Sequence, residues 1–214
     1  MRLPLTVALS CLAASFSTAS AAGPIAFEFE LSGGTQLLDT ELANYRWDIK
    51  QSGLIGFEAR AEAGRFGLGL RANHSNTSQG LGIPGDNRRL DVQLNSLELR
   101  GRIALLETLG FGLYADAGLG RLRISYGPDR LLIVPLGASE AIDVRFERLE
   151  EWLGTAGASI RRDLGSRVAL GLQIERTSFG LDTARRVGTD IEEQRDRFGN
   201  WSGRLSLTWK LGGR

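Results

Sequence analysis

Residues 111–120 read FGLYADAGLG and alternate between two kinds of side chain. The odd-numbered positions, from Phe111 to Leu119, are all apolar, whereas the even-numbered positions hold glycine, tyrosine or aspartate. Successive side chains of a β-strand point to opposite faces of a sheet, so this period of two predicts a strand with one apolar and one polar face. The stretch therefore sets the class of secondary structure from which the fold is built.

The same alternation continues through most of the chain. Helical periodicity is hard to find, and residues 144–152 are its single candidate. Within 90–103 the apolar positions change parity between Leu94 and Leu97, which predicts a β-bulge because one extra residue shifts the phase. We predict eight strands, each long enough to cross a bilayer at a tilt. Seven strands join the one at 111–120, and they cover residues 25–32, 45–62, 66–73, 90–103, 152–161, 168–175 and 201–211.

The connections between these strands alternate in length. Short connections are expected at 63–65, 105–110 and 162–166. Long ones are expected at 35–44, 76–89, 127–150 and 181–199. In an up-and-down barrel, this alternation places all short turns at one end and all long loops at the other, as in outer-membrane barrels. The predicted fold is all-β: a closed antiparallel up-and-down eight-stranded transmembrane β-barrel.

The first residues have the layout of a secretory signal peptide. Met1 and Arg2 give a positive start, an apolar run follows to Phe16, and small residues continue to Ala22. We therefore expect residues 1–22 to be a cleaved signal peptide and residues 23–214 to be the barrel domain. The single cysteine, Cys11, lies in the expected signal, so we predict no disulfide and no thiolate site in the mature chain.

Alternation alone does not say which face lies inside the barrel. A soluble lipocalin-like barrel encloses its apolar face, whereas a membrane barrel turns that face to lipid. We predict the membrane arrangement, because the polar face offers small residues such as Gly67 and Gly118 and charges of both signs that can pair across a narrow lumen. Aromatic residues near strand ends, among them Trp152 and Trp201, are typical of interfacial girdles. The predicted lumen charges are Glu28, Glu30, Glu58, Arg60, Arg100, Arg204 and Lys210.

Three segments resemble the barrel strands of a known family. They are 111–121, 152–161 and 168–176, the last two joined by a tight turn. These strands resemble those of the small bacterial outer-membrane β-barrel proteins, with an eight-stranded barrel like that of OmpA and OmpX. The resemblance covers nearly the whole mature chain. It implies a monomer in the outer membrane of a Gram-negative cell, assembled with periplasmic chaperones and the barrel-assembly machinery.

Composition excludes several kinds of chemistry. The chain has 26 Lys and Arg against 25 Asp and Glu, so no basic excess favours nucleic-acid binding. One histidine and no cysteine in the mature chain make a transition-metal site unexpected, and no cofactor motif is present.

One catalytic motif deserves comparison. The segment around His74 faintly resembles the signature of the outer-membrane lipid A deacylases, in which a histidine polarises a serine two residues on. Here the residue two on is Asn76, and Ser75 points to the opposite face of a strand. Ser78 would reach His74 only if the loop bends. His74 and Ser78 are therefore weak catalytic candidates, and we predict no enzymatic activity.

Arginines in the long loops are candidate contacts for lipopolysaccharide, because guanidinium pairs well with phosphate. They are Arg88, Arg89, Arg185 and Arg186. We predict a structural, adhesion or surface-interaction role through four long external loops. The alternatives are a barrel that transports small solutes or lipids, a lipid A acyl hydrolase using His74, and a soluble periplasmic lipocalin-like binding barrel.

Overall fold

The computed structural model describes residues 25–39, 51–80, 88–134, 140–187 and 190–211, with only the backbone described between residues 183 and 193. Ten strands form in these ranges. They are β1 (Ala26–Leu37), β2 (Gln51–Ala63), β3 (Phe66–Gly80), β4 (Arg89–Thr108), β5 (Phe111–Gly127), β6 (Arg130–Ile133), β7 (Ile142–Arg145), β8 (Leu149–Asp163), β9 (Val168–Val187) and β10 (Asp190–Leu211).

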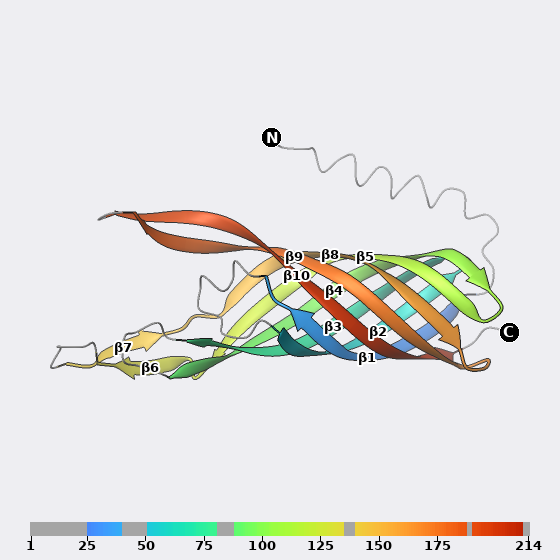
Figure 1. Ribbon diagram of the computed structural model, residues 1–214, viewed down its shortest axis with the longest axis horizontal. Helices are drawn as coiled ribbons and strands as arrows, with labels where there is room; N and C mark the ends of the chain where they lie inside the picture. The colour runs from blue at the N-terminus through green and yellow to red at the C-terminus, as the bar shows by residue number, and fades with distance from the viewer. Residues whose placement is uncertain (1–24, 40–50, 81–87, 135–139, 188–189, 212–214) are drawn as a thin grey trace.

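Eight of these strands close into an antiparallel barrel, which confirms the predicted fold class. Around the barrel the order is β1, β10, β9, β8, β5, β4, β3 and β2, so β1 and β10 meet at the closing seam. Strands β6 and β7 form a separate two-stranded hairpin inside the connection that was predicted as one long loop, 127–150. Figure 1 shows this hairpin and the β9–β10 ribbon projecting from the same end of the barrel.

The register of the strands fixes the tilt of the barrel. A walk along paired residues starts at Leu37 of β1 and returns, after one circuit, to Phe27 of the same strand, a shift of ten residues (37 − 27). Eight strands with this shift tilt by about 41° to the barrel axis, given the usual strand spacing and rise. A barrel of this size has an interior only wide enough for side chains.

The three short turns lie together at one end of the barrel, as predicted. Gly64, Gly110 and Gly165 occupy them with positive φ angles of 59°, 84° and 143°. A side chain is disfavoured in this backbone region, so glycine suits such tight turns. The turn predicted at 105–110 is shorter than expected, because β4 continues to Thr108 with a register shift between Ala104 and Leu106.

The other end of the barrel contains more strand than the sequence suggested. Strands β9 and β10 pair as far as Val187 and Asp190, where the loop 181–199 was expected. The last pairs with their outer neighbours are Leu153 with Phe179 and Leu37 with Trp201. Beyond these, β9 and β10 pair only with each other over eight further rows, a ribbon about 27 Å long.

The bulge predicted between Leu94 and Leu97 is wrong. Strand β4 runs through this segment in unbroken register with both β3 and β5. Leu97 and Leu99 are exposed on the outside, whereas Leu94 and Val92 are buried on the inside. The strand does not slip. Its alternation is strict, and the apolar residues pass from the outer face to the inner face toward the long-loop end.

An apolar belt surrounds the half of the barrel next to the short turns. Its members, such as Phe57, Leu70, Leu99 and Leu172, point outward and are about half exposed. Across the ten residues between Phe27 and Leu37, a tilted strand gives a height of about 25 Å, which is typical of lipid-facing bands. Aromatic residues mark its edges, with Trp152 and Trp201 at the outer edge and Phe66, Phe111 and Trp209 at the inner edge. Tyr45 and Trp47 lie outside the described residues.

Among the described residues, no helix is long and apolar enough to span a membrane.

Candidate functional site

The inside of the belted half is lined by ionised side chains. We call this set the charge network, and none of its members is more than 8% exposed. Six are cations and six are anions, so the network is formally neutral. The cations are Arg60, Arg71, Arg100, Arg102, Arg161 and Arg204, and the anions are Glu28, Glu30, Glu58, Glu98, Asp116 and Glu175.

Glu175 on β9 is the centre of the network. Its carboxylate has three guanidinium partners from other strands: Arg100 at 2.5 Å, Arg204 at 3.1 Å and Arg71 at 3.2 Å. Arg71 also lies 2.6 Å from Glu58. Side chains from β2, β3, β4, β9 and β10 therefore meet on the barrel axis, where each buried charge has an opposite charge within reach.

A second group of ion pairs lies nearer the short turns. Arg161 of β8 reaches Glu28 of β1 at 2.7 Å, and Arg60 reaches Glu58 at 2.5 Å. Arg102 binds Asp116 at 2.7 Å. The planar arginine head donates up to five hydrogen bonds, so one guanidinium can serve several carboxylates. The network thus crosses the lumen at two levels.

Sequence reasoning named part of this network. Glu28, Glu30, Glu58, Arg60, Arg100 and Arg204 are buried in it. Lys210 is not, because it lies at the rim and binds Asp163, with its side chain 22% exposed. The missed members, Arg71, Glu98, Arg102, Asp116, Arg161 and Glu175, share the inward parity of the named ones. Their position on the same face of each strand could therefore have identified them from the sequence.

Between the charge network and the long-loop end, the lining of the lumen changes from charged to apolar. Its walls become apolar, and the inward residues pack into a cluster that we call the apolar cap. Phe179 and Phe198 face each other across the β9–β10 pair with ring centroids 5.9 Å apart. On the outside at the same height, polar residues such as Gln93 and Arg123 are exposed. The cap consists of Leu38, Val92, Leu94, Leu122, Ile124, Leu153, Phe179, Leu181 and Phe198.

The barrel wall is therefore built for two surroundings. Next to the short turns it is apolar outside and charged inside, as a lipid-embedded barrel is. Next to the long loops it is polar outside and apolar inside, as a protein in water is. The change occurs at the outer edge of the apolar belt, where β5 passes from outward Leu119 to outward Arg121. This belt of outward apolar residues excludes the soluble lipocalin-like alternative for the half of the barrel next to the short turns.

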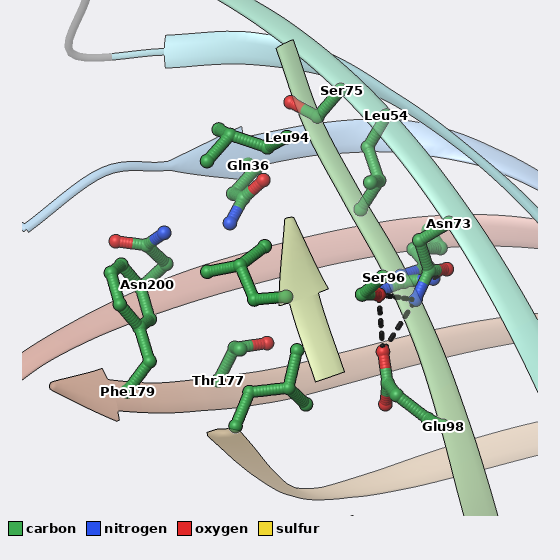
Figure 2. A pocket seen from close by; sticks show the side chains of 13 residues that line it. Gln36, Leu54, Asn73, Ser75, Leu94, Ser96, Glu98, Thr177, Phe179 and Asn200 are labelled. Atoms are coloured by element: carbon green, nitrogen blue, oxygen red, sulfur yellow. Dashed lines mark hydrogen bonds between the residues drawn. The ribbon is translucent and has the colours of Figure 1, made fainter. Parts of the chain in front are cut away.

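A small cavity of about 30 Å³ separates the charge network from the apolar cap. This volume can hold one or two water molecules. Figure 2 shows its polar side, where Asn73 donates to Ser96 at 3.0 Å and to Glu98 at 2.6 Å. The cavity is also lined by Leu54 and the cap residues Leu94, Leu122, Leu153 and Phe179. The cavity is too small to form a passage.

The catalytic candidates are not brought together. His74 is exposed on the outer face of β3, and its Nδ1 lies 2.8 Å from Oδ1 of Asn95 on β4. Ser78 is four residues further along the same strand, a separation of about 13 Å at the usual rise. A nucleophile needs its base within hydrogen-bond distance. Strand β3 continues to Gly80, so residues 76–80 are strand and not the loop that would have had to bend. Among the described residues no cluster of His, Cys, Asp or Glu could hold a metal ion.

The four loop arginines lie in two separate places. Arg88 precedes β4, and its guanidinium donates to the carbonyl of Leu132 on β6 at 3.1 and 3.2 Å. Arg89 pairs in backbone register with Gly80. Arg185 and Arg186 belong to the β9–β10 ribbon, and their side chains lie outside the described residues. In Figure 1 the ribbon and the β6–β7 hairpin leave the barrel end on opposite sides, so the four do not form one site.

The β9–β10 ribbon is braced at its base. Arg195 of β10 binds Glu151 of β8 at 2.5 Å and Asp182 of β9 at 2.8 Å. These hydrogen bonds raise the pKa of Arg195 above its ordinary value. A planar guanidinium thus links carboxylates of β8 and β9 where the ribbon leaves the barrel.

Comparisons with known proteins agree on the fold. The chain matches no protein-family model and no curated protein by sequence. It is similar in structure to Neisserial surface protein A, with a TM-score of 0.53 and 9% identity over 90% of this chain and 100% of that one. The N-terminal β-barrel domain of Pseudomonas aeruginosa OprF is also similar, with a TM-score of 0.47 and 11% identity over 87% and 97% of the two chains. The architecture is that of an eight-stranded outer-membrane β-barrel.

Proposed function

We propose that this protein is a surface-interaction protein of a Gram-negative outer membrane, in which a sealed barrel anchors a rigid external platform. The observation that carries the proposal is the double closure of the lumen. The charge network fills the belted half, and the apolar cap fills the half above it. A solute would have to separate both layers to pass, so the barrel is an anchor and not a channel.

The external end supports the second half of the proposal. The β9–β10 ribbon and the β6–β7 hairpin are hydrogen-bonded strands rather than irregular loops. Arg195 and Arg88 tie each of them to neighbouring strands. Binding to such surfaces costs little ordering of the chain, which favours recognition of a partner. The sealed lumen and the separation of His74 from Ser78 speak against transport and against hydrolysis.

The closed lumen predicts that the protein does not conduct small solutes. Vesicles that contain the folded barrel should swell in isosmotic arabinose no faster than protein-free vesicles. The reason is that ion pairs such as Arg71–Glu175 and the packed cap residues occupy the axis. Vesicles with a general porin provide the positive control. Swelling that rises with the amount of barrel would contradict the sealed lumen and would favour the transport alternative.

We further propose that the external arginines contact lipopolysaccharide. Guanidinium pairs with phosphate through two parallel hydrogen bonds. Exchanging Arg88, Arg89, Arg185 and Arg186 together for serine is expected to weaken binding of purified lipopolysaccharide. The expected loss is about fivefold for each arginine in contact, and it is measured by titration of the detergent-solubilised barrel. Unchanged affinity in the fourfold variant would remove these residues from the interface.

A further inference from the structure

Two arginines at the outer edge of the apolar belt are placed differently from those in the external projections. Arg121 of β5 and Arg176 of β9 both point outward and are exposed. Each lies over a tryptophan of the neighbouring strand, with the guanidinium carbon 4.6 Å from the Trp152 ring and 5.8 Å from the Trp201 ring. These distances are within the range of cation–π contacts. We call them the two Arg–Trp pairs.

The height of these arginines follows from the residues around them. On β5, outward Leu119 precedes Arg121, and Leu122 is the first cap residue inside. On β9, outward Ile174 precedes Arg176. Both arginines are therefore the first polar outward residues of their strands above the belt. Tryptophan is enriched at this depth, where the ring meets both hydrocarbon and headgroups.

Arg176 extends away from the hydrocarbon. A Cβ placed on Gly199 would lie 3.0 Å from Nη2 of Arg176, so the guanidinium rests on the backbone of β10 at this glycine. Gly199 is two residues nearer the external end than Trp201. The aliphatic stem thus lies along the belt edge while the charge reaches toward the headgroup layer, as long basic side chains do at interfaces.

The charges of the two Arg–Trp pairs differ from those of their neighbours in having no carboxylate partner among the described residues. Neither Arg121 nor Arg176 forms an ion pair with a carboxylate in the described part of the chain. Arg123, two residues beyond Arg121, does form one, with Glu150 at 2.8 Å. The described part of the barrel therefore presents these two cations without an ion pair at a similar membrane depth. The paired row of Arg176 meets β5 at Ala117, so Arg121 lies two strand spacings and four residues away, about 16 Å along the wall.

We propose that the two Arg–Trp pairs bind the phosphate groups of anionic lipids in the outer leaflet. The inference rests on the proposed outer-membrane location and adds a lipid site on the barrel wall to it. In each pair the tryptophan ring lies against the acyl-chain boundary and holds the guanidinium in place, and the guanidinium donates to the phosphate. Such a site would fix the depth and the rotation of the barrel in its membrane.

The test uses the fluorescence of one tryptophan at a time. Two parent proteins are made, one retaining only Trp152 and one retaining only Trp201, with the other three tryptophans of the chain changed to phenylalanine. Each is inserted into phosphatidylcholine vesicles with a minor fraction of spin-labelled phosphatidylglycerol or spin-labelled phosphatidylcholine. Both lipids have a phosphate, but choline neutralises it in the second. The ratio of quenching by the two lipids reports the local preference for the anionic one.

We expect a preference of about fivefold for phosphatidylglycerol at each tryptophan. R121Q should abolish it at Trp152 and leave it at Trp201, and R176Q should do the reverse. R176K, which keeps the charge, should retain most of the preference, and R123Q should change neither ratio because that charge is already paired with Glu150.

Equal quenching by the two lipids, or a preference that survives R121Q and R176Q, would overturn the lipid site while leaving the sealed anchor intact. Absence of quenching by either lipid in a barrel shown to be folded by its heat-dependent gel mobility would overturn both proposals, because the belt would then lie outside the bilayer.

Discussion

Replacing Glu175 by glutamine is expected to lower the free energy of unfolding by about 3–5 kcal/mol, the usual effect of removing one partner from a buried ion pair. The carboxylate is fully buried and serves Arg71, Arg100 and Arg204. Glutamine has nearly the same shape, so packing is kept while three guanidinium groups lose their shared counter-charge. Urea unfolding in lipid vesicles, followed by tryptophan fluorescence and gel mobility, measures the change.

The matched control for Glu175 is an exposed pair. E150Q removes the partner of Arg123, where both side chains are about half exposed, and should cost less than about 1 kcal/mol. In the double variant E175Q/R204Q the two losses should not add, because each substitution removes the same interaction. A loss for E175Q no larger than that for E150Q would show that the lumen is hydrated enough to screen its charges.

Replacing Leu70 by arginine is expected to cost about 2–4 kcal/mol in a bilayer, the penalty measured for arginine on the lipid face at the midplane. Leu70 is 56% exposed on β3 and lies midway along the outward row from Phe66 to His74. A surface leucine of a soluble protein would tolerate the same change almost without effect. The comparison of unfolding in vesicles therefore tests directly whether the belt contacts lipid.

His74→Arg is the control for depth. It changes an exposed residue of the same strand and the same face, four positions nearer the outer edge. There the penalty for arginine falls to about 0–1 kcal/mol. Equal costs at positions 70 and 74 would mean that the belt ends elsewhere, or that both residues meet water.

Much of the architecture was available from the sequence, because a strict period of two survives in every barrel strand. The eight barrel strands, the three short turns and the shared face of Glu28 and Glu30 follow from the alternation. The alternation could not show what surrounds each face of a strand at a given height of the barrel. Leu94 and Leu97 have opposite parity, and the sequence analysis explained this with a bulge. In the structure the alternation of β4 is unbroken. Leu97 points outward within the apolar belt, whereas Leu94 points inward and packs against apolar neighbours.

The partners within the lumen were also beyond sequence reasoning. Glu175 lies 104 residues from Arg71 in the chain, and only the ten-residue shift around the barrel brings their side chains together. The same limit applies to the external end. Residues 181–199 contain glycine and many charges, which is typical of a loop, yet 181–187 and 190–199 continue as paired strands. Cross-strand hydrogen bonds outweigh local propensity there.

Because β1 pairs with β10, the barrel can close only after the last strand has been synthesised. Arg71 and Arg100 leave the ribosome long before Glu175 and Arg204. An open sheet of the earlier strands therefore carries Arg100 without its nearest counter-charge, and its inner face stays hydrated. When β9 and β10 arrive, the same event joins the two edges, brings Glu175 to Arg71 and Arg100, and removes the water. Closure of the barrel and dehydration of its lumen are thus coupled. An unfinished chain keeps a hydrated inner face, which distinguishes it from a finished one.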